Sequence, residues 1–274
     1  MNVLEAFCLG ALQGLTEFLP ISSSGHLVLA QHLLGFRESQ LFFDVAVHVG
    51  TLMAVFLVFR GDLALMLRGC LRALGQATSS QATATSNGLN SGVKLAWMIL
   101  VGSIPTAIIG LLFKDVFARF FTSPAIVALG LWITGFFLIW SRRSRPNPKH
   151  PDNPGVFNAL MIGLVQGAAI TPGVSRSGVT ITLGMLLGLE PDLAFRFSFL
   201  LSIPAILGAL ALEAFHGGGN YPEWQVVAVG FFSAFLVGWF ALRILRSLVS
   251  KGKLFYFAPY CLVLGAVAFL IAFL

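Results

Sequence analysis

Two short segments of this chain carry side chains of the kinds that perform phosphoryl transfer. The first, residues 10–27, reads GALQGLTEFLPISSSGHL, and the second, residues 163–180, reads GLVQGAAITPGVSRSGVT. Serine hydroxyls beside a histidine and a carboxylate provide a nucleophile and a base, and an arginine provides positive charge that stabilises the oxygens on phosphorus. The residue types therefore predict a site that binds a phosphate-like anion and is equipped to hydrolyse it.

The ionisable residues of the first segment are spaced so that they can act together. Glu17 lies four residues after Gln13, so both side chains fall on one face of a short helix and could hold a cation or orient a reacting group. His26 follows the serines, within the first turns of the next helix. A divalent cation, Mg²⁺ or Ca²⁺, is expected beside a carboxylate and bound phosphate groups, which makes Glu17 the predicted metal ligand.

The two segments are one pattern written twice, at an offset of 153 residues and with matching glycine, glutamine and serine positions. Each copy reads as a short apolar helix, a break that contains proline, and a serine-rich start to a second short helix. Helix starts of this kind attract anions, and Arg176 adds a fixed charge that can bind phosphate through two hydrogen bonds. The other residues expected to bind the phosphate are Gln13, Ser22, Ser24, Ser175, Ser177 and Thr180.

The composition places these segments in a lipid bilayer. Apolar residues make up 57% of the 274 residues and charged residues 10%, and the mean hydropathy is +0.88. These values exclude a soluble globular enzyme, and the apolar runs are continuous, as in spanning helices. The sequence predicts six spanning helices, at about residues 42–59, 95–113, 124–140, 194–212, 224–242 and 254–274.

The two motif segments require a different arrangement. Residues 3–34 and 157–189 each contain two apolar stretches that are too short to span a bilayer, so each is predicted to form a re-entrant helical hairpin. Because three spans follow each hairpin, the second half must run in the opposite sense to the first. The expected fold class is an all-α polytopic membrane protein with an inverted-topology repeat. Its predicted units are a first repeat at 1–141, a linker at 142–155 and a second repeat at 156–274.

Basic residues set the expected orientation of the chain in the membrane. They collect in the first long loop, in the linker and in the last loop, which share one side of the membrane if the spans are as predicted. The positive-inside rule then places the linker in the cytoplasm and both termini outside, with the hairpins entering from opposite sides. The net charge of +6 suits contact with anionic lipid, and nothing in the pattern indicates nucleic acid.

Other residues of the predicted spans receive a structural interpretation. Asp44 and His48 lie one helical turn apart on the first span and Arg196 opens the fourth, and a structural or interfacial role is favoured for them over a catalytic one. Small residues at 102–110 and 230–238 suit tight helix packing, either within one chain or between the two copies of a homodimer.

Residues 13–26 (QGLTEFLPISSSGH) and 172–178 (PGVSRSG) closely resemble the undecaprenyl-diphosphate phosphatase family, also known as bacitracin-resistance proteins. The resemblance covers essentially the whole chain, including its length and the order of its segments. It implies hydrolysis of undecaprenyl diphosphate to the monophosphate and inorganic phosphate, which recycles the lipid carrier of bacterial cell-wall synthesis. It also implies a location in the cytoplasmic membrane, with the active site at its outer face.

The family motifs imply roles for individual residues. The (E/Q)xxxE motif falls on Gln13 and Glu17, so Glu17 carries most of any metal binding, and the family's serine, histidine and arginine fall on Ser23, His26 and Arg176. We expect Ser23 to attack the terminal phosphorus with His26 as base. The rival assignment makes His26 the nucleophile and Ser23 a phosphate ligand.

A second function class also fits part of the pattern. Inverted repeats with broken helices are typical of transporters, and a flippase for a prenyl-phosphate lipid would also need an anion site in the membrane. A serine and a histidine beside a carboxylate favour hydrolysis, because a translocation site does not need them. A purely structural subunit would bury Glu17 and Arg176 for packing alone, which is costly in lipid.

Overall fold

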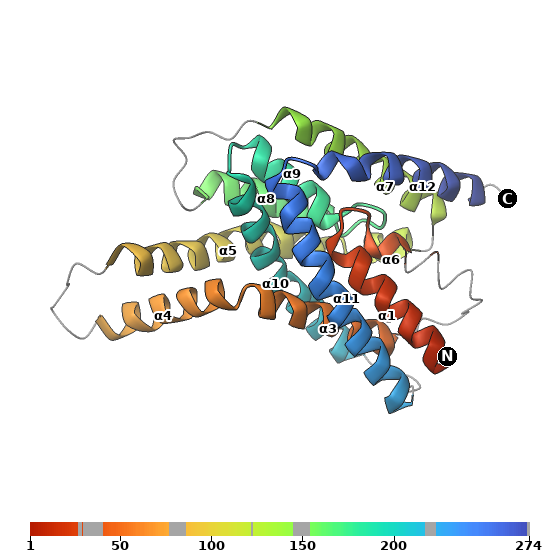
Figure 1. The fold of residues 1–274 in the computed structure, drawn as a ribbon, viewed down its shortest axis with the longest axis horizontal. Coiled ribbons are helices and arrows are strands. Elements are labelled where there is room, and N and C mark those ends of the chain that lie inside the picture. Colours follow the sequence, from red (N-terminus) through yellow and green to blue (C-terminus); the bar gives the residue numbers. More distant parts are fainter. Residues whose placement is uncertain are drawn as a thin grey trace.

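Most of the chain that the structure describes is helical, and that part contains no strand (Figure 1). The structure is a computed structural model that describes residues 1–26, 29, 41–76, 86–121, 123–144, 154–216 and 223–272. In chain order its helices are α1 (Val3–Phe18), α3 (Leu41–Val58), α4 (Arg60–Gln76), α5 (Ser86–Leu112), α6 (Lys114–Phe120), α7 (Pro124–Trp140), η1 (Ser141–Arg143), α8 (Val156–Ala168), α9 (Arg176–Leu186), α10 (Pro191–His216), α11 (Trp224–Ser250), η2 (Leu254–Phe257) and α12 (Ala258–Ile271).

Most of the predicted spans are confirmed. Among the described residues, five helical segments are long and apolar enough to cross a membrane, and they lie in α5, α7, α10, α11 and the η2–α12 segment. The span predicted at 42–59 corresponds to α3, which meets the length and hydropathy criteria only together with α4, and the pair is bent by 74°. The protein is therefore a multi-pass membrane protein with five or six such segments.

The helices of the two motif segments are shorter. Helix α1 has 16 residues, α8 has 13 and α9 has 11, whereas about 20 are needed to span a bilayer. As predicted, a serine caps the helical turn after each break. The Ser22 hydroxyl accepts a hydrogen bond from Gly25 N at 3.4 Å, and the Ser175 hydroxyl accepts one from Gly178 N at 3.2 Å. The sequence repeat is therefore also a repeat of local structure.

Glycines let each motif helix pack closely against a helix from the other half of the chain. Helix α1 packs against α11, and α8 packs against α5 (Figure 1). A Cβ atom on Gly10 would lie 2.4 Å from Gly230 O, and one on Gly163 would lie 2.0 Å from Gly102 O. The small residues at 102–110 and 230–238 thus support close packing within one chain.

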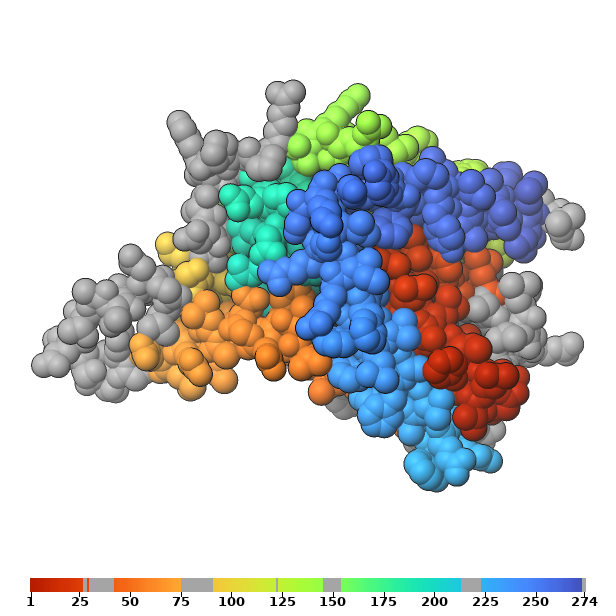
Figure 2. All heavy atoms as spheres, viewed as in Figure 1, coloured from red at the N-terminus to blue at the C-terminus, as the bar shows by residue number. Residues whose placement is uncertain are grey.

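A cluster of buried phenylalanines fixes the end of α1 against α10. The Phe18 and Phe199 rings make an edge contact with centroids 5.6 Å apart, and Phe195 and Phe59 pack against Phe199. Figure 2 shows the outer face of this region, where side chains of α11 lie between those of α1 and α4. Because Phe18 follows Glu17 directly, this packing also positions the Glu17 side chain.

Candidate active site

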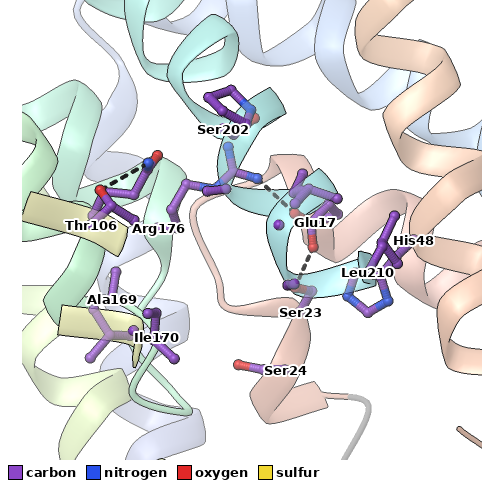
Figure 3. Close-up of a pocket in the computed structure, with 18 of the residues that line it drawn as sticks. Glu17, Ser23, Ser24, His48, Thr106, Ala169, Ile170, Arg176, Ser202 and Leu210 are labelled. Atoms are coloured by element: carbon purple, nitrogen blue, oxygen red, sulfur yellow. Dashed lines mark hydrogen bonds and ion pairs between the residues drawn. The ribbon is translucent and has the colours of Figure 1, made fainter. Parts of the chain in front are cut away.

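Three side chains donate hydrogen bonds to the carboxylate of Glu17, at the end of α1 (Figure 3). Ser23 Oγ donates to Glu17 Oε2 at 2.7 Å, and Gln13 Nε2 donates to the same oxygen at 3.1 Å. Arg176 Nη2 donates to Glu17 Oε1 at 2.7 Å. The structure therefore brings together four residues that the sequence singled out, one of them from the second motif.

Arg176 is well placed to bind an anion. It is the first residue of α9, and the side chains of this ion pair are only 15% exposed for Arg176 and 9% exposed for Glu17. Its guanidinium lies over the Phe199 ring at 5.6 Å, while its second terminal nitrogen, Nη1, is buried and has no hydrogen-bond partner in the described part of the chain. A buried donor without a partner is costly unless a ligand satisfies it. Arg176 can thus hold Glu17 with one nitrogen and an anionic oxygen with the other.

An unusual backbone turn aims Ser23 at Glu17. Ser22 has φ of 70°, in the left-handed region that costs a non-glycine residue about 1–2 kcal/mol. The turn is held by Ser22 O, which accepts hydrogen bonds from the backbone N of His26 at 3.3 Å and from its ring Nδ1 at 2.7 Å. These two hydrogen bonds offset part of the cost of the Ser22 conformation.

His26 is not brought to the Ser23 hydroxyl. A carbonyl oxygen only accepts hydrogen bonds, so His26 Nδ1 carries the proton and Nε2 accepts from the Tyr260 hydroxyl at 2.6 Å. The two rings are parallel within 4°, with centroids 5.7 Å apart. Both ring nitrogens are therefore occupied away from Ser23, and His26 is not among the residues that line the pocket described next. Sequence spacing placed His26 on the correct turn but could not predict the direction of its ring.

Glu17, Ser23 and Arg176 line one cavity of about 670 Å³. Three of the predicted phosphate-binding residues, Ser22, Ser24 and Ser175, also line it. An apolar wall extends from this polar end and is formed mainly by side chains of α5 and α10, including Ala107, Leu111, Ala205, Ile206, Ala209 and Leu210. A polar end where Arg176 Nη1 has no protein partner among the described residues, beside an apolar wall, suits an anionic group attached to a lipid tail.

The other three residues predicted to bind phosphate do not line the cavity, but each contacts a residue that does. Gln13 reaches the site through Glu17. Ser177 is buried, with its hydroxyl 3.2 Å from that of Ser175, and Thr180 is buried and donates to Arg176 O at 2.7 Å. These residues thus form a layer outside the side chains that line the cavity.

The sequence did not predict that two further residues, His48 and Gln166, line the pocket. His48 on α3 lines the cavity, although its position suggested a structural or interfacial role. Gln166 lines it too, and its Nε2 donates to Leu201 O at 3.2 Å and to Thr106 Oγ1 at 3.3 Å. The available signal for Gln166 was its equivalence to Gln13 in the repeat. For His48 it was only the presence of a histidine inside an apolar run.

Glu17 is the carboxylate among the described pocket residues that would hold the expected divalent cation, together with the phosphate groups of a substrate. No three histidine, cysteine, aspartate or glutamate side chains gather among the described residues in a way that could hold a metal ion. Both Glu17 oxygens already accept hydrogen bonds, and Arg176 occupies the position where a cation would neutralise Oε1. Arg176 is thus the positive charge that contacts Glu17 in this structure, and the divalent cation stays a prediction.

Comparison with known proteins identifies relatives over the full length of the chain. The family model described as bacitracin resistance protein BacA matches residues 6–267. The chain is similar to the undecaprenyl-diphosphatase of Desulfosudis oleivorans, with 46% identity over 97% of both proteins. It is also 44% identical to that of Desulforapulum autotrophicum, over 100% of this chain and 99% of the relative, and 37% identical to that of Methanobrevibacter smithii, over 98% of both.

Proposed function

The chain belongs to the family of bacitracin resistance protein BacA, and we propose that it hydrolyses undecaprenyl diphosphate to undecaprenyl phosphate and inorganic phosphate. It is a membrane-bound hydrolase, and its pocket is the catalytic site. The observation that carries this proposal is the convergence of Ser23 and Arg176 on the carboxylate of Glu17 beside an apolar wall. A nucleophile, a base and a phosphate ligand are thus in contact where a lipid tail can also bind.

The substrate binds with its two ends in different parts of the pocket. The diphosphate lies at the polar end, where Arg176 Nη1 offers a donor and the Ser22, Ser24 and Ser175 hydroxyls line the cavity. The start of the prenyl chain lies along the wall of α5 and α10, where contact with apolar side chains replaces contact with lipid. This placement directs the terminal phosphorus towards Ser23.

Hydrolysis proceeds through a phosphoserine. Ser23 Oγ forms a bond to the terminal phosphorus, its proton passes to Glu17 Oε2, and the bridging P–O bond breaks to release undecaprenyl phosphate. Arg176 stabilises the charge that develops on the phosphoryl oxygens. Water then attacks the phosphoserine, and the Ser23 oxygen regains its proton from Glu17. Glu17 takes the role of base that the sequence suggested for His26, because Ser23 already donates to it.

His26 acts as a positioning residue in this mechanism. Its ring ties the Ser22 carbonyl to the Tyr260 hydroxyl, and Ser22 precedes the nucleophile directly. Loss of this link would let the turn relax and move the Ser23 hydroxyl from Glu17. The contribution of His26 is thus to the geometry of attack.

The membrane arrangement that we propose is an inverted repeat in the bacterial cytoplasmic membrane. Units 1–141 and 156–274 run in opposite senses, with the linker at 142–155 in the cytoplasm and the pocket open to the exterior. Short motif helices and matching serine caps support re-entrant hairpins. In a variant without the native cysteines, Arg142→Cys should react with an impermeant maleimide only in inside-out vesicles, and reaction in right-side-out cells would contradict this orientation.

Phosphate release by the purified protein in detergent tests the function. The wild type should release phosphate from undecaprenyl diphosphate, and acid quenching should trap phosphate on Ser23. Ser23→Ala should abolish both signals, whereas Ser250→Ala, which removes an exposed hydroxyl that does not line the cavity, should behave as the wild type. Phosphate release is also the result that excludes a transporter, because detergent micelles hold no transmembrane gradient. A phosphohistidine at His26 would overturn the assignment of the nucleophile.

A further inference from the structure

We propose that His48 orients the water molecule that hydrolyses the phosphoserine, by accepting a hydrogen bond from that water at its Nε2 atom. The inference rests on the proposed function of Ser23 and adds a residue for the second half of the reaction. It starts from a histidine that faces the pocket and is not used by the first chemical step.

His48 lies where it can reach the reacting groups. It is a partly exposed residue of α3 and lines the same cavity as Glu17, Ser23 and Arg176. Figure 3 shows its imidazole on the side of the pocket that holds Glu17 and Ser23, across from Thr106.

One hydrogen bond determines which nitrogen of His48 carries the proton. Its Nδ1 lies 2.7 Å from the backbone oxygen of Asp44, one turn earlier on α3. Because a carbonyl oxygen only accepts, Nδ1 is the donor and Nε2 keeps its lone pair. No side chain in the described part of the chain donates to Nε2, so this atom is an acceptor available to a molecule in the pocket.

The two other ionisable side chains that could accept a hydrogen bond from this water, His26 and Glu17, are already in use. Both nitrogens of His26 are bonded to Ser22 and Tyr260. Glu17 binds Arg176 through one oxygen, and after the first step its other oxygen holds the proton that came from Ser23. Among these three ionisable side chains, His48 Nε2 is therefore the acceptor that remains available to a water molecule approaching the phosphoserine.

The hydrolytic step then balances without a further reactant. The water oxygen forms a bond to phosphorus while one of its O–H groups points at His48 Nε2, and the bond from phosphorus to the Ser23 oxygen breaks. The Ser23 oxygen takes the proton held by Glu17, and the second water proton moves to a phosphoryl oxygen. The products are free Ser23, ionised Glu17 and dihydrogen phosphate. His48 keeps its protonation state and contributes by aiming the water.

Two substitutions of His48 separate this role from a structural one. His48→Leu fills a similar volume without an acceptor, whereas His48→Gln carries an amide oxygen that can reach the same water. We expect His48→Leu to lower the rate of phosphoserine hydrolysis by about tenfold to a hundredfold, since misplacement of a reacting group costs that much. Formation of the phosphoserine should stay close to the wild-type rate, and His48→Gln should recover most of the hydrolysis.

The measurement is a rapid-quench time course on the purified protein with undecaprenyl diphosphate. Intact-protein mass spectrometry follows phosphoserine, and phosphate release follows turnover. His48→Leu should accumulate phosphoserine and show a burst of undecaprenyl phosphate. Met53→Leu, an exposed position on the same helix, is the control and should behave as wild type, and melting temperatures show whether each variant is folded.

The unfavourable outcomes are distinguishable. If Ser23 is phosphorylated in the wild type but His48→Leu hydrolyses the phosphoserine at the wild-type rate, or slows its formation equally, the role of His48 is refuted and the proposed function stands. If His48→Gln is as slow as His48→Leu in folded protein, the acceptor role is likewise refuted. If neither the wild type nor any variant forms phosphoserine, the proposed mechanism at Ser23 fails, and the role of His48 fails with it.

Discussion

Replacement of Arg176 by lysine tests the central contact of the site. Arg176 Nη2 is bonded to Glu17 Oε1, and Nη1 is buried without a protein partner in the described residues, so the guanidinium can serve the carboxylate and the substrate at the same time. A lysine keeps the positive charge, but its compact ammonium group cannot place N–H donors at both positions that Nη1 and Nη2 of the guanidinium reach. The variant therefore removes one charge-assisted hydrogen bond and leaves the net charge unchanged.

The expected size of the effect follows from that single bond. A hydrogen bond to a charged group contributes about 1.5–3 kcal/mol, and a tenfold change in rate corresponds to about 1.4 kcal/mol, so kcat/KM should fall about tenfold to 150-fold. Arg176→Ala goes further, because it leaves the largely buried Glu17 carboxylate without its cation. Breaking a buried ion pair in this way costs about 3–5 kcal/mol of stability.

Phosphate release and thermal unfolding in detergent measure the two effects separately. Arg176→Lys should unfold near the wild-type temperature with reduced kcat/KM. Arg176→Ala should lose activity and melt earlier, and Glu17→Gln in the same chain should recover the melting temperature but not the activity. Arg243→Lys is the matched control, because Arg243 stacks on Trp239 at 4.1 Å and does not line the pocket. An Arg176→Lys variant with wild-type kcat/KM would refute the assignment of Nη1 to the substrate.

Two further substitutions test the elements that support the site. Gly163→Ala would place a Cβ atom 2.0 Å from Gly102 O, so it should destabilise the protein by about 1–3 kcal/mol in detergent melts. The control, Gly61→Ala, meets nothing within 4 Å and should melt as the wild type does. Equal melting temperatures for the two variants would contradict the close packing of α8 on α5. Tyr260→Phe removes the donor to His26 Nε2 and should lower kcat about two- to twelvefold at an unchanged KM. A wild-type kcat would show that this hydrogen bond does not hold the backbone turn at Ser22.

The sequence was sufficient to predict the membrane setting and to single out four residues that the structure brings together, namely Gln13, Glu17, Ser23 and Arg176. Long apolar runs determine where helices can span a bilayer, and five of the predicted spans are confirmed. The sequence paired Ser23 with His26, and only the structure shows that Ser23 and Arg176 both contact Glu17. A carboxylate, a hydroxyl and a guanidinium that all lie at helix breaks in lipid have few other ways to satisfy their hydrogen bonds.

The features of the site and fold that the sequence could not predict depend on distant residues and on side-chain rotamers. The ring of His26 turns towards Tyr260, which lies 234 residues away in the chain, and spacing within one motif carries no information about that partner. His48 lies in an otherwise apolar helix, so only the placement of α3 beside the pocket shows that it faces the cavity. The bend of 74° between α3 and α4 was missed because the apolar run gives no sign of where the helix axis changes direction.

Two equivalent positions of the repeat, Ser23 and Arg176, have different roles in the site. Ser23 and Arg176 match at the offset of 153 residues, and both donate to the same carboxylate, one to each oxygen. Two serines there would provide hydroxyls without a charge, and two arginines would provide charge without a nucleophile. Only one copy keeps a carboxylate, because Ile170 stands where the first copy has Glu17, and a second negative charge in the cavity would repel a diphosphate. The duplicated backbone thus builds one pocket from two similar helix starts, and hydrolysis requires that their side chains differ.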